Sequence, residues 1–170
     1  SIWLLDPTTN ELTCRQATGP QSDIVRGWRL KSGEGLAGWV VREGKSLMVH
    51  DAEKDTRHFK DVGQQTGLVT RSILSVPLKT KQHVIGVLQA MDTQMHRFNS
   101  EHITLLELLA ASAAIAIDNA RLVETLRQRT IELEARNEDL GRLTYLASHN
   151  LRAPLVNLQG FTAELRAAFE

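Results

Sequence analysis

The chain has 170 residues, 20 Lys and Arg against 20 Asp and Glu, and a hydrophobic fraction of 42%. This length allows one ordinary domain with an appended segment, and the composition is typical of a soluble globular protein. The formal net charge of zero and the lack of a basic cluster argue against nucleic acid or an anionic membrane as a partner. Cys14 is the single cysteine, which excludes an intrachain disulfide and a multi-cysteine zinc site and is typical of the cytoplasm.

Residues 1–95 predict a sheet, because turn-forming residues separate short apolar or β-branched runs. Strands are predicted at 2–5, 12–17, 28–30, 46–49, 72–78 and 84–91. The polar connections 6–10 and 79–83 indicate two hairpin loops. Between the third and fourth strands, Leu36, Trp39 and Val40 have helical spacing, which predicts a short helix that stops at Gly44. A polar loop is expected over 51–65.

From Asn99 the apolar pattern becomes helical, with Asn99 as the predicted N-cap and no proline before Pro154. A helix over 100–168 would be roughly 100 Å long at 1.5 Å per residue. A single globular domain cannot cover that length, so something else must bury its apolar stripe. The most apolar part, 105–117, contains Glu107 and Ser112 and is too short to cross a bilayer. No transmembrane segment is therefore predicted.

Beyond about residue 122 the apolar stripe follows a heptad repeat. Position a holds Val123, Thr130, Asn137 and Thr144, and position d holds Leu126, Leu133, Leu140 and Ala147. This pattern predicts a two-stranded coiled coil, and Asn137 at position a favours a parallel, in-register homodimer. Arg129 and Glu134 of the partner copy have opposite charges across the seam, which agrees with a parallel homodimer. Gly141, at position e, is either a tolerated surface glycine or a soft joint.

Residues 148–155, with the sequence Ser-His-Asn-Leu-Arg-Ala-Pro-Leu, combine a titratable histidine with a proline inside a helical pattern. Neutral imidazole is a nitrogen nucleophile whose pKa lies near neutrality. Pro154 has no N–H, so it frees the carbonyl of Asn150 and is expected to kink the helix. The heptad frame places His149 at position f, away from the seam, where another domain could reach it.

The region 1–121 resembles a GAF domain, a small-molecule sensing fold. The resemblance rests on 33–40, Asp51, Asp55, 70–78, 85–88 and 97–101. It implies an α+β fold, with an antiparallel sheet flanked by helices, here followed by the long C-terminal helix of a parallel coiled-coil dimer. The first helix usual in the family is missing. Residues 122–145 would form a coiled-coil signalling linker, and 146–170 would begin a dimerisation and phosphoacceptor helix.

The segment 148–155 resembles the phosphoacceptor box of sensor histidine kinases, and seven of its eight positions fit. The departure is Asn150, where the family has Asp or Glu. The resemblance implies that His149, Asn150 and Pro154 form the catalytic segment. It also implies that a separate catalytic domain supplies ATP and Mg²⁺, and that a response-regulator receiver domain takes the phosphoryl group. The chain contains no phosphate-binding loop, so we expect no cofactor of its own and no activity alone. Both of its ends look cut.

Trp39, His50, Asp51, Arg57 and His58 are the candidate ligand-binding residues of the GAF region. No metal is expected, because the histidines have no compact ligand spacing. One alternative is a dimeric GAF ligand-binding module that regulates another effector without phosphotransfer. Another is an enzyme within the GAF domain itself. It is disfavoured because GAF methionine sulfoxide reductases need several redox cysteines and no paired acid or nucleophile set is present.

Overall fold

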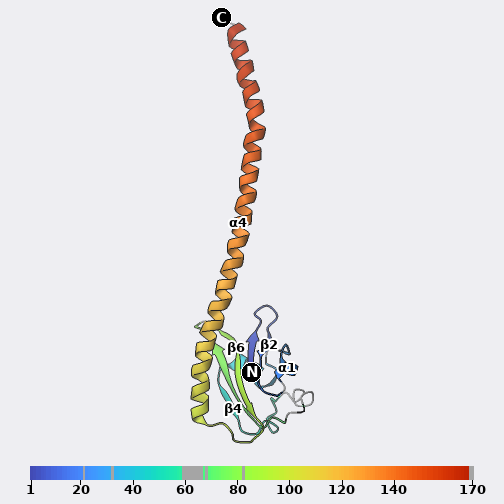
Figure 1. Ribbon diagram of the computed structural model, residues 1–170, viewed down its shortest axis with the longest axis vertical. Helices are drawn as coiled ribbons and strands as arrows, with labels where there is room; N and C mark the ends of the chain where they lie inside the picture. Colours follow the sequence, from blue (N-terminus) through green and yellow to red (C-terminus); the bar gives the residue numbers. More distant parts are fainter. Residues whose placement is uncertain (21, 32, 59–66, 68, 82, 169–170) are drawn as a thin grey trace. The chain divides into compact units, whose positions relative to one another are not determined.

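The structure is a computed structural model that describes residues 1–20, 22–31, 33–58, 67, 69–81 and 83–168 (Figure 1). Beyond residue 146, the described side chains are those of Asn150 and Pro154, and the exposure of Gly160 is also described. The chain separates into two compact units, Ser1–Ala120 and Arg121–Glu170.

The first unit is built on one antiparallel sheet of six strands in the order β3-β2-β1-β6-β5-β4. The strands are β1 (Ile2–Leu5), β2 (Glu11–Gln16), β3 (Arg29–Lys31), β4 (Leu47–Val49), β5 (Ser72–Lys79) and β6 (Val84–Asp92). All six predicted strands are present, and their ends lie within one residue of the predicted ones. Strands β1 and β2, and strands β5 and β6, pair antiparallel as the two predicted hairpins.

The helices are α1 (Ser22–Val25), α2 (Gly35–Glu43) and α4 (Ser100–Ala168). The predicted stop of α2 is confirmed, because Gly44 is left-handed at φ 60° and its N–H donates to the carbonyl of Val40. The predicted N-cap of α4 is confirmed as well. Asn99 Oδ1 accepts hydrogen bonds from the backbone N–H groups of Glu101 and His102, each at 3.1 Å. The helix continues through Pro154.

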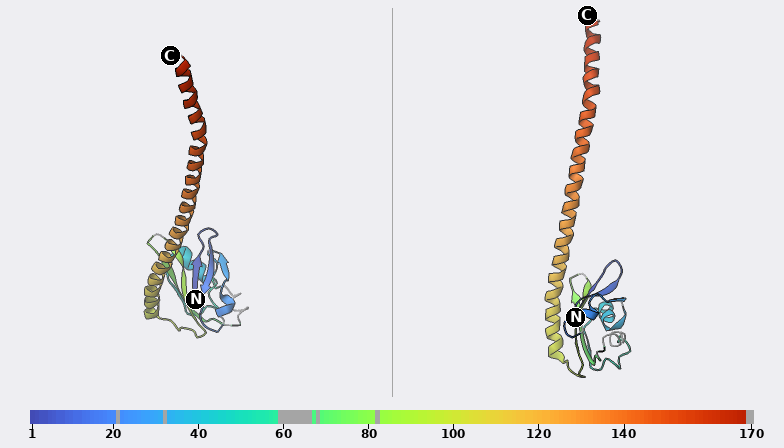
Figure 2. Two further views of the ribbon diagram at one scale, coloured as in Figure 1. Left: turned by 45° about the horizontal axis from the view of Figure 1, so that its top comes forward. Right: turned by 45° about the vertical axis from the view of Figure 1, so that its right-hand side comes forward.

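The sheet lies between α2 and the first turns of α4 (Figure 2). Alternate side chains of β1 point to opposite faces of the sheet, as the two-residue period of a strand requires. Trp3 packs with Val40 of α2. Ile2 and Leu4 pack in the cluster that contains the buried residue Ala114 of α4. The fold is therefore α+β, with a GAF-like curled sheet and a long C-terminal helix.

Candidate functional site

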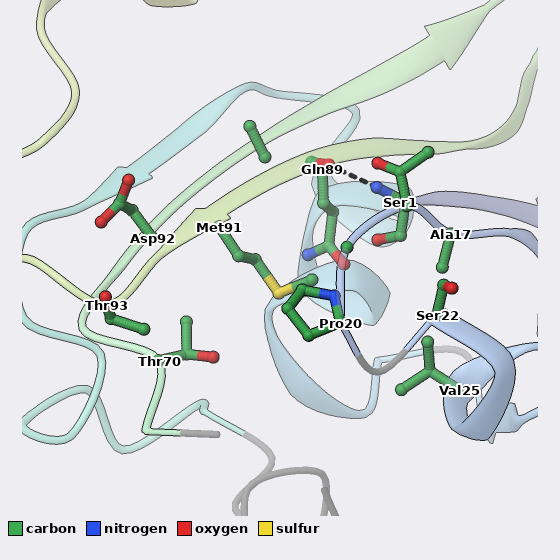
Figure 3. A pocket seen from close by; sticks show the side chains of 13 residues that line it. Ser1, Ala17, Pro20, Ser22, Val25, Thr70, Gln89, Met91, Asp92 and Thr93 are labelled. Atoms are coloured by element: carbon green, nitrogen blue, oxygen red, sulfur yellow. Dashed lines mark hydrogen bonds between the residues drawn. The ribbon is translucent and has the colours of Figure 1, made fainter. Parts of the chain in front are cut away.

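A cavity of about 540 Å³ lies beside the C-terminal end of β6 (Figure 3). Its walls come from the segment around α1, from Thr70 ahead of β5, and from the last residues of β6. Figure 3 shows Met91 reaching from β6 toward Pro20. The lining residues are Ser1, Ala17, Thr18, Gly19, Pro20, Ser22, Val25, Thr70, Gln89, Ala90, Met91, Asp92 and Thr93.

A smaller cavity of about 60 Å³ adjoins the first one between the sheet and α2. Apolar side chains dominate it, and the residues that it shares with the larger cavity are Ser1, Val25, Thr70, Gln89 and Met91. An apolar recess with a few polar groups is the usual form of a small-molecule site. The two adjoining cavities therefore form the candidate ligand site of the first unit.

Gln89 supplies the buried amide of this site. It is 8% exposed, and its Nε2 donates a 2.7 Å hydrogen bond to Oγ of Ser75, which is 0% exposed. A buried polar pair of this kind is stable only when it is hydrogen-bonded. The bond holds the Gln89 amide at the cavity wall, where it can meet a polar group of a bound molecule.

Three of the five predicted ligand-binding residues, Trp39, Arg57 and His58, line a third cavity of about 470 Å³ beside the N-terminus of α2. The Arg57 guanidinium lies 4.9 Å from the centre of the Trp39 ring, a cation–π distance. Hydrogen bonds from the Arg57 side chain lower the pKa of Asp55, and the same contact raises the pKa of Arg57. His58 also lines the smaller inner cavity. This histidine therefore contributes both to the candidate ligand site and to the third cavity.

The other two predicted residues, His50 and Asp51, lie elsewhere. The ring of His50 stacks on His96 with centroids 4.9 Å apart. Asp51 forms ion pairs with Lys54 at 3.3 Å and with Arg71 at 3.6 Å. Its Oδ1 atom is buried and, among the described residues, has no hydrogen-bond partner. The ion pairs of Asp51 lie within the connection between β4 and β5, whereas the His50–His96 contact joins that connection to the one between β6 and α4.

The sequence analysis missed the polar residues of the larger site, above all Gln89, together with Ser75, the hydrogen-bond partner of Gln89. One signal was available, because Gln89 interrupts an otherwise apolar strand. A polar residue at a buried strand position needs a hydrogen-bond partner. Pairing of β5 with β6 places Ser75 directly opposite Gln89, and the predicted hairpin could have shown this.

The predicted phosphoacceptor segment lies within α4. Asn150 and Pro154 are exposed. The side chain of His149 lies outside the described residues, so its place at position f stays a prediction.

Residues 1–118 match the GAF domain family. The chain belongs to this family. Among curated relatives, the GAF chain is 36% identical over 103 residues to the methanogenesis regulatory histidine kinase FilI of Methanothrix harundinacea. It is 30% identical over 100 residues to the probable 3′,5′-cyclic phosphodiesterase pde-5 of Caenorhabditis elegans. These matches cover 56% and 59% of this chain but 12% and 14% of the two relatives.

Solved GAF domains share the fold. The GAF domain of a phosphoenolpyruvate-protein phosphotransferase from Acinetobacter aligns with a TM-score of 0.61 at 26% identity, over 74% of this chain and 73% of that one. The corresponding domain from Coxiella burnetii aligns with a TM-score of 0.65 at 24% identity, over 74% of each chain. The protein is thus a regulatory GAF module, with relatives among both histidine kinases and phosphodiesterases.

Proposed function

We propose that this GAF domain and its helix are the sensory and relay part of a histidine kinase, in which His149 accepts the phosphoryl group. The segment 148–155 carries the proposal. It fits the phosphoacceptor pattern at seven of eight positions and follows the GAF domain on one helix. The relative FilI, named a regulatory histidine kinase, supports the same assignment.

In the proposed reaction, an imidazole nitrogen of His149 attacks the γ-phosphorus of ATP. A P–N bond forms as the bond to the ADP oxygen breaks, and the other ring nitrogen then releases its proton. The phosphoryl group passes next to an aspartate of a response-regulator receiver domain. A separate catalytic domain would hold ATP and Mg²⁺, since this sequence has no Gly-x-x-x-x-Gly-Lys-Ser/Thr loop. We place both reactions in the cytoplasm.

We further propose that two copies pair through the C-terminal helix as a parallel coiled coil. Val123, Leu126, Leu133 and Leu140, at positions a and d, are 58–65% exposed. A line of large apolar side chains at heptad spacing is stable in water when a second helix covers it. Arg129 lies 3.1 Å from Glu132 of its own helix and, in the dimer, would also face Glu134 of the other copy.

For the sensor, we propose that the adjoining cavities beside β6 bind a small, mainly apolar molecule that hydrogen-bonds to Gln89. The two cavities share Gln89 and Met91 and measure about 540 and 60 Å³. The cavity around Trp39 and Arg57 is more polar and is the second candidate. In either case, α4 would carry the change in the domain toward His149.

A second candidate function is a dimeric GAF module that regulates another effector, with no phosphotransfer. The relative that favours it is the probable cyclic phosphodiesterase, which is 30% identical over 100 residues. The two candidates share the ligand site and the dimer and differ in the role of His149.

Phosphorylation in trans tests the proposal. The chain is incubated with γ-labelled ATP, Mg²⁺ and the ATP-binding domain of a histidine kinase that labels its own phosphoacceptor helix. We expect an acid-labile label on the wild type and on His83→Ala, which changes an exposed loop histidine, but none on His149→Ala. An unlabelled wild type, or equal label on His149→Ala, would favour the second candidate.

A further inference from the structure

The third cavity lies on a different face of α2 from the candidate ligand site. Leu36 and Ala37 are each 3% exposed and line the smaller inner cavity against the sheet. Trp39 and Arg42 line the third cavity and, being three residues apart, share the outer face of the helix. The two faces of α2 therefore border two recesses of different chemistry.

The walls of the third cavity are positively charged. Arg42 and Arg57 both line it, and among its described lining residues none is acidic. The larger cavity beside β6 has the opposite character, because the charged residue that lines it is Asp92. Two guanidinium groups at one cavity repel a cation and attract an anion.

Arg57 is held rigidly with part of its donors free. The Trp39 ring centre lies 4.9 Å from the guanidinium carbon, and Asp55 accepts from Nε at 2.9 Å and from Nη2 at 2.6 Å. A guanidinium has five N–H donors, so Asp55 occupies two of them. The Nη1 group has no hydrogen-bond acceptor among the described residues. A side chain fixed in this way loses little further entropy when it binds a second oxyanion.

Arg42 brings a second set of donors to the same cavity. Its Nε donates to Glu43 at 2.9 Å, and neither Nη nitrogen has an acceptor among the residues that the structure describes. Nη1 lies 3.7 Å from the point that a Cβ atom on Gly33 would take. Gly33 also lines the cavity, so the Nη1 donors of Arg42 border open space rather than a side chain.

We propose that the third cavity binds a phosphate group, either of a small molecule or of a lipid headgroup. A phosphate monoester carries a charge of about −1.5 to −2 at pH 7, which two arginines neutralise. Its oxygens accept paired N–H donors from guanidinium groups, and the Thr56 side chain at the cavity can donate one more hydrogen bond. The proposal rests on the sensor role proposed above and gives the second candidate cavity a ligand class.

Other ligand classes fit these walls less well. An apolar molecule would cover the guanidinium donors without pairing them, which costs free energy. Nucleic acid is bound through many phosphates along a basic stripe, whereas this cavity offers two arginines on a chain of formal net charge zero. One phosphate group matches the charge and the donors present.

Isothermal titration of the 170-residue chain with inorganic phosphate at pH 7 tests the inference, with sodium chloride of equal ionic strength as the blank. Arg42→Gln and Arg57→Gln each remove one guanidinium. Arg97→Gln is the matched control, because Arg97 lies outside the cavity and resembles Arg42 in exposure, 55% against 59%, and in pairing through Nε with an acid. Circular dichroism establishes that each variant is folded. Arg57→Gln leaves Asp55 unpaired, so Arg42→Gln is the deciding variant.

We expect the wild type and Arg97→Gln to bind phosphate with a dissociation constant of about 1 mM or lower. Arg42→Gln and Arg57→Gln should bind it at least about tenfold more weakly. A wild type that does not bind phosphate, or an Arg42→Gln variant with unchanged affinity, overturns the inference. Neither result bears on phosphorylation of His149, which is measured separately, so the two proposals fail independently.

Sedimentation with vesicles of phosphatidylcholine and phosphatidic acid distinguishes the two sources of the phosphate group. The segment Ser100–Leu146 of α4 is itself long and apolar enough to cross a bilayer, so pelleting alone does not identify headgroup binding. Pelleting of the wild type that is lost in Arg42→Gln assigns the site to a lipid headgroup. If the chain binds inorganic phosphate but does not pellet, or pellets equally with Arg42→Gln, the ligand is a small molecule.

Discussion

Asp55 binds Arg57 through both carboxylate oxygens, at 2.9 Å from Nε and 2.6 Å from Nη2, and also accepts the Arg57 backbone N–H. These bonds lower the pKa of Asp55. The ionised carboxylate therefore stabilises the fold above the ordinary aspartate pKa of about 3.9, and this stabilisation is lost as pH falls through the lower pKa of the folded state. We expect Asp55→Asn to lower the free energy of unfolding at pH 7 by about 1 kcal/mol.

Urea unfolding from pH 7 down to pH 2 measures this contribution. The difference between Asp55→Asn and the wild type should shrink once the pH drops below about 4. Asp23→Asn is the control, because Asp23 is 91% exposed and 3.8 Å from Arg26, and it should change little at any pH. A deficit of Asp55→Asn that persists unchanged at pH 2 contradicts an ionic origin.

Asn150 is the position at which the proposed phosphoacceptor segment departs from its pattern. An amide can donate and accept hydrogen bonds but cannot take up a proton at neutral pH. If an acidic residue there serves as the proton acceptor, Asn150→Asp should raise the rate of His149 phosphorylation by about tenfold or more. Asn150 is exposed, so the change should leave stability nearly unaltered. An unchanged rate would show that the position is not a base site.

Of the predicted ligand-binding residues, the structure brings together Trp39, Arg57 and His58, which line the third cavity, and of these three His58 alone also lines the candidate ligand site beside β6. Arg57 and His58 are adjacent, and Trp39 comes from the helix whose N-terminus they approach. Gln89 and Met91 were missed because their partners, including Ser1 and Thr70, are remote in sequence. Only the pairing and curl of the strands bring such residues to one cavity.

Among the elements, the strands were predictable because turn residues bound each one and their apolar residues alternate. The helix α1 was missed, since its four residues are too few for helical periodicity and none is buried. The pairing of β1 with β6 could not be predicted from local pattern. It joins residues more than eighty positions apart and depends on tertiary packing.

Gly86 shows the close approach of these two strands. A Cβ atom built there would collide with the carbonyl oxygen of Trp3 and meet Leu4 Cα at 3.1 Å. We therefore expect Gly86→Ala to lower the free energy of unfolding by about 1–3 kcal/mol, because β1 must shift away from β6. Urea unfolding of the chain measures the change.

Gly141→Ala is the matched glycine control. Gly141 lies within α4, and a Cβ atom there would meet nothing within 4 Å. Alanine should stabilise the helix by about 1 kcal/mol. Equal stability of Gly86→Ala and the wild type would contradict the close approach. A loss of phosphorylation in Gly141→Ala without a loss of stability would identify Gly141 as a joint.

For the whole molecule, α4 is the element common to both units, Ser1–Ala120 and Arg121–Glu170. The subdivision of the second unit into a linker over 122–145 and a phosphoacceptor region over 146–170 remains a prediction. In our account, two copies of α4 pair in parallel and in register. Identical residues at position d then meet across the seam.

Disulfide cross-linking tests this arrangement. In a Cys14→Ser background, Leu126→Cys at position d should form an intersubunit disulfide on mild oxidation, because in-register d positions bring the two Cβ atoms close together. Gln128→Cys, at the outward position f, should not. Equal cross-linking at both positions would point to random collision, and none at Leu126 would contradict a parallel, in-register seam.

The central claim is that the GAF domain, the dimeric helix and His149 are functionally coupled. The most direct test is the initial rate at which His149 gains acid-labile phosphate in trans. The account predicts that the wild type and Ala135→Arg, a change at the outward position f, are labelled at the same rate. Leu133→Arg places a charge at position d of the linker seam, sixteen residues before His149, and should be labelled at least about tenfold more slowly because its dimer is weaker. A wild type without label on His149, or a Leu133→Arg variant that is monomeric yet labelled at the wild-type rate, would contradict the account.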